Sequence, residues 1–406
     1  MAEPDARTAG PDADDGPTTP AEVLARARAA APLLRARSEE IERARRLPAD
    51  VVRLLRSTGV FRMAVAADRG GPELTSAQQT EVIEVLSHGD PAAGWCAMIG
   101  MDTPLYAAFL PAEVVDDMFP HPDVITAGLI LPTGRAERVP GGYRLTGRWR
   151  FGSGITHADW VSAGSVVTSG GEPETGPGGG PVWRVLLVRP DQVETLDTWH
   201  TTGLRGSGSL DYAITDVFVP EEHSFSFAAP LSRTGPLATP DAFVRNMPGV
   251  PLGLARAALD HAREQVTTRV DRLTGRRWAD DYRVQYAIGE AELDFQAARH
   301  AVYGSLDRQW ELLASGRTLD DFTPDERIST ALPRLNAFRA ARRIVTGLYD
   351  LLGTSSIYEP SPLDRWLRDI TTMCQHVVAQ DQVVQSAGAH VLGGTPRFPF
   401  ALGIVD

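Results

Sequence analysis

Apolar residues recur every three or four positions over the first third of the chain, which is the spacing of one buried face of an α-helix. In residues 21–46, Val, Leu and Ile stand among Ala, Arg and Glu, most of which are good helix formers. The next segment, PADVVRLLRSTGVF, begins at Pro48 and stops at Gly59, residue types typical of helix starts and ends. TSAQQTEVIEVLSHGD and the stretch from Pro91 through AAGWCAMIGM predict two more helices.

The pattern changes at residue 124, where Gly, Thr, Val and aromatic residues become frequent and turn sequences such as PGG appear. Four segments predict strands: YRLTGRWRF, WVSAGSVVT, VWRVLLVRP and DYAITDVFVP. In the last of them, apolar side chains alternate on either side of a predicted bulge at Asp216. SGGEPETGPGGGP, between the second and third strands, is predicted to be a flexible surface excursion.

Long helical stripes return in the last part of the chain. Apolar positions step by three or four without a break over residues 284–313, as a helix of a bundle requires. A second stripe covers residues 328–352, and a third covers residues 363–377. These stripes predict a bundle of packed helices.

The three patterns together predict an α+β multidomain chain. We expect an N-terminal helical domain at residues 21–123, a middle β domain at 124–235 and a C-terminal helical bundle at 236–406. Residues 1–20 are acidic and Pro-rich, which predicts a disordered tail, and they lack the basic and apolar regions of a signal peptide.

Composition and charge exclude several classes of function. The net charge of -12, without a basic stripe, argues against a nucleic-acid partner. No uncharged apolar run approaches the ~20 residues that span a bilayer, so no membrane association is expected. Cys96 and Cys374 form no C-x-x-C motif, and the histidines form no recognisable ligand set, so no metal is expected. These features predict a cytoplasmic protein.

One short stretch, RFGSGITHADW, carries a candidate for chemistry. Ser153 lies between Gly152 and Gly154, and glycine lets a backbone approach a ligand closely. The stretch would then present one hydroxyl and bare amides to something large and flat, although an ordinary strand-to-strand turn is the alternative. For His157, a turn cap and a ligand contact both stay open, and Trp160 is predicted to lie in the core.

Four motifs in this order resemble the acyl-CoA dehydrogenase fold: GDPAAGWCAMIG, GRWRFGSGITHADW, WHTTGLRGSGSLDYAITDVFVP and LLGTSSIYEPSPLDRWLRDITTMCQHV. Within that fold, residues 25–395 are similar to the two-component, reduced-flavin-dependent (group D) aromatic monooxygenases. The resemblance implies a central antiparallel β-barrel or sandwich, a C-terminal four-helix bundle and a homotetramer built as a dimer of dimers. It also implies reduced FMN or FAD, with O2 as co-substrate, and a C4a-hydroperoxyflavin that oxygenates an aromatic or heteroaromatic small molecule.

The resemblance assigns catalytic roles to two residues. Ser153 would hydrogen-bond the N5 region of the flavin, and His376 would lie beside the substrate, where a neutral imidazole can take a phenolic proton. By periodicity alone, His376 lies to one side of a helix face centred on Val377. Asp369 and other polar residues share that flank, which would line a cavity as readily as it would face solvent.

The remaining flavin contacts come from loops and one helix. Arg205, Ser207 and Ser209 lie in a glycine-rich loop that offers amides, hydroxyls and one cation. An ordinary polar turn is the alternative there and at LLGTSSIY, which would reach the flavin phosphate from a neighbouring subunit. Trp95 matches an aromatic near the flavin, with a core tryptophan as the equal alternative. The predicted flavin-binding residues are Trp95, Phe151, Gly152, Ser153, Gly154, Arg205, Ser207, Arg277, Thr354, Ser355 and Ser356.

Two other functions remain open at this point. An acyl-CoA dehydrogenase or oxidase-like flavoprotein would have a catalytic glutamate where Val377 stands, and an earlier helix offers only Asp260 and Glu264 instead. A redox-neutral or non-catalytic flavin-binding homologue is the third hypothesis. Because no G-x-G-x-x-G follows a predicted strand, reduced flavin is expected from a separate NAD(P)H-dependent flavin reductase.

Overall fold

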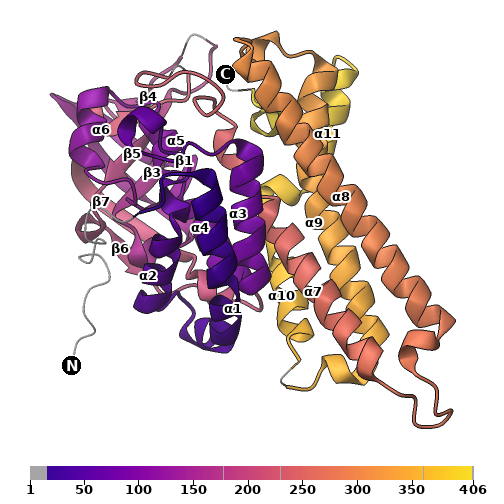
Figure 1. Ribbon diagram of the computed structural model, residues 1–406. Helices are drawn as coiled ribbons and strands as arrows, with labels where there is room; N and C mark the ends of the chain where they lie inside the picture. The colour runs from indigo at the N-terminus through magenta and orange to yellow at the C-terminus, as the bar shows by residue number, and fades with distance from the viewer. Residues whose placement is uncertain (1–15, 177, 229, 360, 405–406) are drawn as a thin grey trace, which may run out of the picture.

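Capped helices make up the N-terminal part of the chain (Figure 1). The computed structural model describes residues 16–404 apart from residues 177, 229 and 360. The helices are α1 Pro20–Ala44, α2 Ala49–Thr58, α3 Ser76–Gly89, α4 Pro91–Gly100, α5 Thr103–Ala107 and α6 Ala112–Met118. Thr19 and Thr75 begin α1 and α3 with capping boxes, and Gly59 ends α2 in the left-handed region. Residues 1–15 of the predicted tail lie outside the described residues.

The middle of the chain forms one mixed sheet. Its strands are β1 Thr126–Val139, β2 Gly142–Gly152, β3 Trp160–Ser169, β4 Glu172–Pro173, β5 Trp183–Val188, β6 Glu194–Leu196, β7 Leu210–Pro220 and β8 Ser224–Phe225. Their order is β6-β7-β2-β1-β3-β5-β8, with β4 paired to β3. The bulge predicted at Asp216 is confirmed, since this residue has a φ of 52° and the β2–β7 register shifts beside it.

The prediction of a purely antiparallel sheet is wrong at its centre. Strand β2 pairs with β1 on one side, and the chain then crosses to the other side of β1. Strand β3 therefore runs parallel to β1, from Thr126 opposite Trp160 to Glu137 opposite Thr168. Among the described residues the sheet stays open, with β6 and β8 at its two ends.

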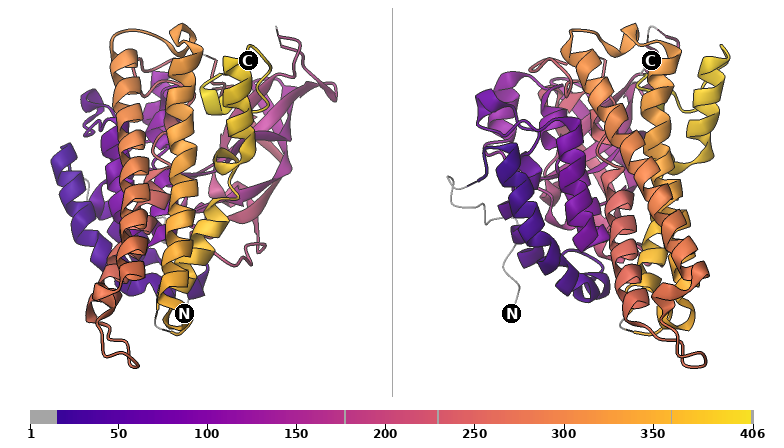
Figure 2. Two further views of the ribbon diagram at one scale, coloured as in Figure 1. Left: turned by 90° about the vertical axis from the view of Figure 1, so that its right-hand side faces the viewer. Right: turned by 45° about the vertical axis from the view of Figure 1, so that its right-hand side comes forward.

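Long helices form the C-terminal part, and Figure 2 shows α8 and α9 side by side along most of their length. They are α7 Gly249–Thr268, α8 Tyr282–Ala314, α9 Pro324–Leu352, α10 Leu363–Met373 and α11 Asp381–Val391. The stripes predicted at 284–313 and 328–352 are confirmed as the buried faces of α8 and α9. None of the described helices has both the length and the apolar character needed to cross a membrane.

The third predicted stripe ends too late. Helix α10 stops at Met373, and His376 has an extended backbone with a φ of -66° and a ψ of 145°. Gln380 donates to the carbonyl of Cys374 at 2.6 Å, which satisfies a free carbonyl at the end of the helix. Periodicity predicted His376 on a helix face, and this prediction is wrong. His376 lies in the turn that follows the helix.

Helix α4 lies at the junction of the three parts. It packs against α3, α7, α10, β1 and the loop that leads into β7. All its residues except Ile99 are buried, as expected for a helix that is apolar on every side. Gly94 permits this packing, because a Cβ there would lie 1.9 Å from Oγ of Ser87 on α3. Figure 1 shows α3 and α4 between the sheet and the long C-terminal helices, whereas α6 lies on the far side of the molecule from those helices.

Candidate flavin site

Trp95 brings together the two residues with predicted catalytic roles. Its indole Nε1 donates a hydrogen bond to Ser153 Oγ at 3.1 Å. Its ring also meets the imidazole of His376 edge to face, with centroids 5.5 Å apart and an interplanar angle of 75°. Trp95 is only 5% exposed, so both contacts are made inside the protein. Segments separated by more than 200 residues therefore meet at one indole ring.

The backbone around Ser153 is shaped by a break at the end of β2. The β2–β7 register shifts between Trp149 and Gly152, and Phe151 has a φ of 64°, a strained value for a phenylalanine. Phe151 is 57% exposed, whereas Ser153 is 6% exposed and turns inward. Gly154 has a φ of 75° and donates its N–H to the carbonyl of Ser207 at 3.0 Å. Strain of this kind commonly marks functional sites.

A chain of three serine hydroxyls leads away from this point. Ser153 Oγ lies 2.7 Å from Ser209 Oγ, which lies 2.7 Å from Ser207 Oγ. Ser207 in turn donates to the carbonyl of Leu204 at 2.7 Å. All three serines are buried. We call Ser153, Ser209 and Ser207 the serine chain. Ser153 and Ser207 are among the predicted flavin-binding residues, whereas Ser209, which joins them, was predicted only as part of the loop.

Helix α10 holds the loop that carries two of these serines. Asp369 accepts a hydrogen bond from the N–H of Leu204 at 2.6 Å, and burial raises the pKa of this carboxyl to about 7. Arg368 donates to the carbonyl of Thr202 at 2.6 Å and pairs with Glu42 at 2.5 Å. The sequence placed Asp369 on the same flank as His376, but its contact fixes the loop instead.

His376 is buried enough to stay neutral. Desolvation lowers the pKa of its imidazole to about 4, although the residue as a whole is only partly buried. Nδ1 lies 3.5 Å from the N–H of Val378, which is long for a hydrogen bond and does not fix the tautomer. At pH 7 the group therefore presents an uncharged ring, able to accept or donate one hydrogen bond.

His157 and Trp160 belong to the packing around the site. Trp160 is in the core as predicted, 7% exposed, and donates to the carbonyl of Met118 at 2.9 Å. His157 is 3% exposed, and neither ring nitrogen has a partner among the described residues. Burial, together with the positive charge of Arg56, lowers its pKa to about 3. The turn-cap alternative therefore has no side-chain hydrogen bond from His157 to support it within the described part of the chain.

The other predicted flavin contacts lie in two places. Arg205 is half-buried in the loop beside the serine chain, and its Nε has no partner among the described residues. Ser355 and Ser356 instead donate to the carbonyls of Leu352 and Tyr349, near the C-terminal end of α9. Thr354 is exposed beside them, and Arg277 is 63% exposed and lies 3.4 Å from Asp280. No described contact joins this second group to Ser153.

These residues fit the edge of a flavin. Ser153 Oγ accepts from Trp95 and keeps one further lone pair. The exposed ring of Phe151 offers an apolar surface beside it, 6.3 Å from the ring of Trp199. Arg205 adds an unpaired donor. This set suits a planar, partly apolar ring with polar edges.

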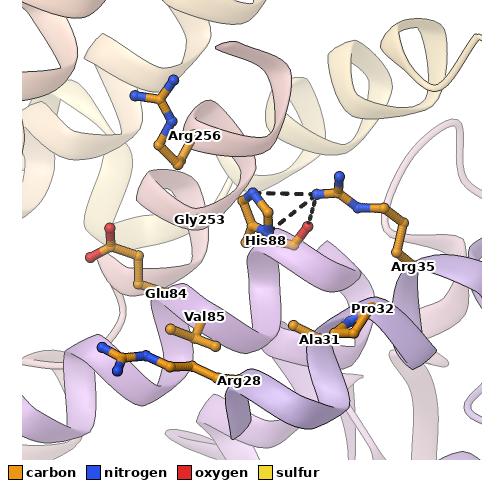
Figure 3. A pocket seen from close by; sticks show the side chains of 9 residues that line it. All are labelled: Arg28, Ala31, Pro32, Arg35, Glu84, Val85, His88, Gly253 and Arg256. Atoms are coloured by element: carbon orange, nitrogen blue, oxygen red, sulfur yellow. Dashed lines mark hydrogen bonds between the residues drawn. The ribbon is translucent and has the colours of Figure 1, made fainter. Parts of the chain in front are cut away.

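A separate groove of about 400 Å³ lies between α1, α3 and α7 (Figure 3). Arg35 donates to the carbonyl of His88 at 2.5 Å there, and the His88 ring lies 3.0 Å from Asp260. Asp260 also pairs with Arg256 at 2.8 Å. Ser153, Trp95 and His376 do not line this groove.

Comparison with known proteins agrees with this description. Residues 248–381 match the family model described as Acyl-CoA dehydrogenase, C-terminal domain. The solved structure of XiaF from Streptomyces sp. in complex with FADH2 and glycerol superposes with a TM-score of 0.85, at 27% identity over 93% of this chain and 96% of that one. The fold is thus that of the acyl-CoA dehydrogenases.

Sequence relatives narrow the class. The chain is 33% identical to indole-3-acetate monooxygenase from Pseudomonas putida, over 89% of this chain and 91% of that protein. It is 28% identical to the oxygenase component of FADH(2)-dependent resorcinol hydroxylase from Rhizobium sp. (strain MTP-10005), over 92% and 95%. The chain belongs to the flavin-dependent monooxygenases built on the acyl-CoA dehydrogenase fold.

Proposed function

We propose that this chain is the oxygenase component of a two-component monooxygenase that acts on an aromatic or heteroaromatic small molecule. It would use FMNH2 or FADH2 and O2, with reduced flavin supplied by a separate NAD(P)H-dependent flavin reductase. The observation that carries the proposal is the meeting of Ser153 and His376 at the indole of Trp95. The substrates in the names of two relatives, indole-3-acetate and resorcinol, are both small aromatic molecules.

Each residue of the site has a distinct part. Bound reduced flavin would supply the electrons that activate O2. Ser153 would hold the edge of the flavin ring, and Trp95 would fix the position of the serine oxygen through its Nε1–H. His376 would face the substrate as a neutral ring that accepts or donates one proton. Because its pKa is about 4, we expect it to orient a phenol more strongly than it deprotonates one.

The acyl-CoA dehydrogenase alternative lacks its base. Val377 stands at the position that the glutamate would occupy, in the short turn after α10. Asp260, a candidate from an earlier helix, is held by His88 and Arg256, two of the residues that line the groove of Figure 3. Glu264, the other candidate, is exposed. Neither residue offers a free carboxylate beside Trp95. These contacts favour oxygenation over abstraction of a proton from a thioester.

We also propose that the chain works in the cytoplasm as a homotetramer, with a four-helix C-terminal bundle. An exposed apolar strip on α8 supports self-association, since Tyr282, Tyr286 and Leu293 are 76%, 58% and 64% exposed. At ~100° per residue, these three side chains lie within about 40° of one another around the helix. The exposed Thr354 and Arg277 would complete a flavin site in a neighbouring subunit.

Isotope labelling tests the proposed function. The purified chain, mixed with chemically reduced FMN or FAD and a panel of small aromatic compounds, is exposed to ¹⁸O2. We expect one ¹⁸O atom in the product, detected by mass spectrometry, and loss of product in Ser153→Ala. Bleaching of bound oxidised flavin by an acyl-CoA, without incorporation of oxygen, would instead establish the dehydrogenase alternative.

A further inference from the structure

The hydrogen bonds of the serine chain all point the same way, because each hydroxyl has only one proton to donate. The carbonyl of Leu204 can only accept, and its shortest contact is with Ser207 Oγ at 2.7 Å. With the Ser207 proton used there, the proton between Ser207 and Ser209 has to come from Ser209. By the same count, the proton between Ser209 and Ser153 comes from Ser153.

This count leaves Ser153 as an acceptor. Its own proton points to Ser209, and the indole N–H of Trp95 points at its oxygen. The remaining capacity of the oxygen is one lone pair. Reduced flavin carries a hydrogen on N5, whereas N5 of oxidised flavin is a bare acceptor. An acceptor at Ser153 can therefore receive a hydrogen bond from N5 of reduced flavin. Facing oxidised flavin, the same oxygen would meet another acceptor, and no hydrogen bond could form.

We propose that Ser209 and Ser207 are positioning residues that keep Ser153 as an acceptor, so that the site selects reduced over oxidised flavin. The inference rests on the proposed function, because it requires flavin N5 to lie against Ser153. It adds a role for two hydroxyls that never touch the ring. A site with this preference would capture the flavin that a reductase delivers and release it once it is oxidised.

The size of the preference for reduced flavin follows from the free-energy cost of reversing the hydrogen bonds of the serine chain. Ser153 can donate to oxidised flavin only if Ser207 withdraws its proton from Leu204. That carbonyl keeps two other donors at 3.0 Å, the N–H of Ser207 and Nε1 of Trp199. Reversal therefore costs about one neutral hydrogen bond, which corresponds to roughly a two- to tenfold preference in affinity.

The test is the ratio of the dissociation constants for oxidised and reduced flavin. Both are measured anaerobically with FMN and with FAD, by fluorescence titration of the full chain. We expect Ser209→Ala to lower the ratio by roughly two- to tenfold, mainly through tighter binding of oxidised flavin, because Ser153 is then free to donate. Ser209→Thr, which keeps the hydroxyl, is expected to preserve the ratio.

Controls separate this inference from the proposed function. Ser165→Ala removes an equally buried hydroxyl of β3 outside the serine chain and is expected to leave the ratio unchanged. If Ser209→Ala leaves the ratio unchanged while Ser153→Ala weakens binding of both flavin states, the role of the serine chain in selecting reduced flavin is wrong. The proposed function would then still stand. Unchanged binding in Ser153→Ala would overturn the flavin position itself. If Ser209→Ala does not fold, Ser207→Ala makes the same test, since it frees Ser209 to donate to Ser153.

Discussion

Replacement of Trp95 by phenylalanine isolates the contact on which the site depends. Trp95→Phe keeps an aromatic ring beside His376 but removes the Nε1–H that Ser153 accepts at 3.1 Å. One buried neutral hydrogen bond contributes about 1 kcal/mol, and a poorer ring contact with His376 removes about 0.5 kcal/mol more. We therefore expect the free energy of unfolding to fall by about 1.5 kcal/mol. Affinity for reduced flavin should fall by roughly fivefold, because the serine oxygen is no longer fixed.

Trp149 offers a matched control for this experiment. It is fully buried, donates Nε1–H to the carbonyl of Gly164 at 2.8 Å and stacks on Tyr212 with centroids 5.4 Å apart. Trp149→Phe should cost a similar free energy of unfolding in urea titrations while the affinity for reduced flavin stays the same. Equal losses of flavin affinity in both variants would refute the reasoning, since the effect would then follow stability alone.

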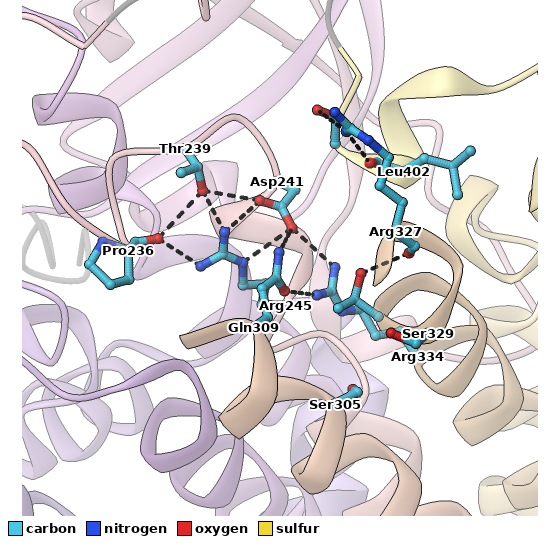
Figure 4. Close-up of polar contacts among 12 residues, drawn as sticks. Pro236, Thr239, Asp241, Arg245, Ser305, Gln309, Arg327, Ser329, Arg334 and Leu402 are labelled. Atoms are coloured by element: carbon cyan, nitrogen blue, oxygen red, sulfur yellow. Dashed lines mark hydrogen bonds and ion pairs between the residues drawn. The ribbon is translucent and has the colours of Figure 1, made fainter. Parts of the chain in front are cut away.

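Three further predictions concern buried titratable groups. Burial raises the pKa of Asp369 to about 7 in the folded chain, whereas the ordinary value of 3.8 applies to the unfolded chain. Stability therefore falls as pH rises between these two values. Asp369→Asn should flatten this part of the Tm profile, and an unchanged slope would count against it. The pKa of His157 is lowered to about 3, so stability is lost as pH falls below its ordinary value of 6.5, and His157→Phe should remove that loss in acid unfolding curves. Asp241 pairs with Arg245 at 2.6 Å and Arg334 at 3.3 Å (Figure 4). Asp241→Asn should therefore cost about 3 to 5 kcal/mol by calorimetry, and a loss below 1 kcal/mol would contradict the network.

The hydrophobic pattern predicted the long helices better than it predicted the turns between elements and the pairing of the strands. The faces of α8 and α9 follow from unbroken spacing over long segments. The apolar spacing continues from Met373 to Val377, beyond the end of α10, so the predicted helix was too long. Periodicity alone does not show where a turn interrupts a helix. Strand β1, Thr126–Val139, was not among the predicted strands, since its first half has no clear alternation. Its parallel pairing with β3 depends on where the chain crosses the sheet.

The site shows the same limit. The motifs that carry the family resemblance were enough to select Trp95, Ser153 and His376 as candidates. The contact of Ser153 with Ser209 joins residues 56 positions apart, and that of Asp369 with Leu204 joins residues 165 positions apart. Such hydrogen bonds exist only once α10, the β7 loop and β2 have packed. The family resemblance therefore supplied the side chains of the site but not the hydrogen bonds that orient them.

A structure of the chain crystallised anaerobically with reduced flavin would test the central claim most directly. The account predicts flavin N5 within hydrogen-bond distance of Ser153 Oγ, with the ring against Gly152 and Gly154 and its substrate side open to His376. Flavin bound elsewhere, as in the groove beside Arg35 and His88, with Ser153 bonded only to protein, would contradict it.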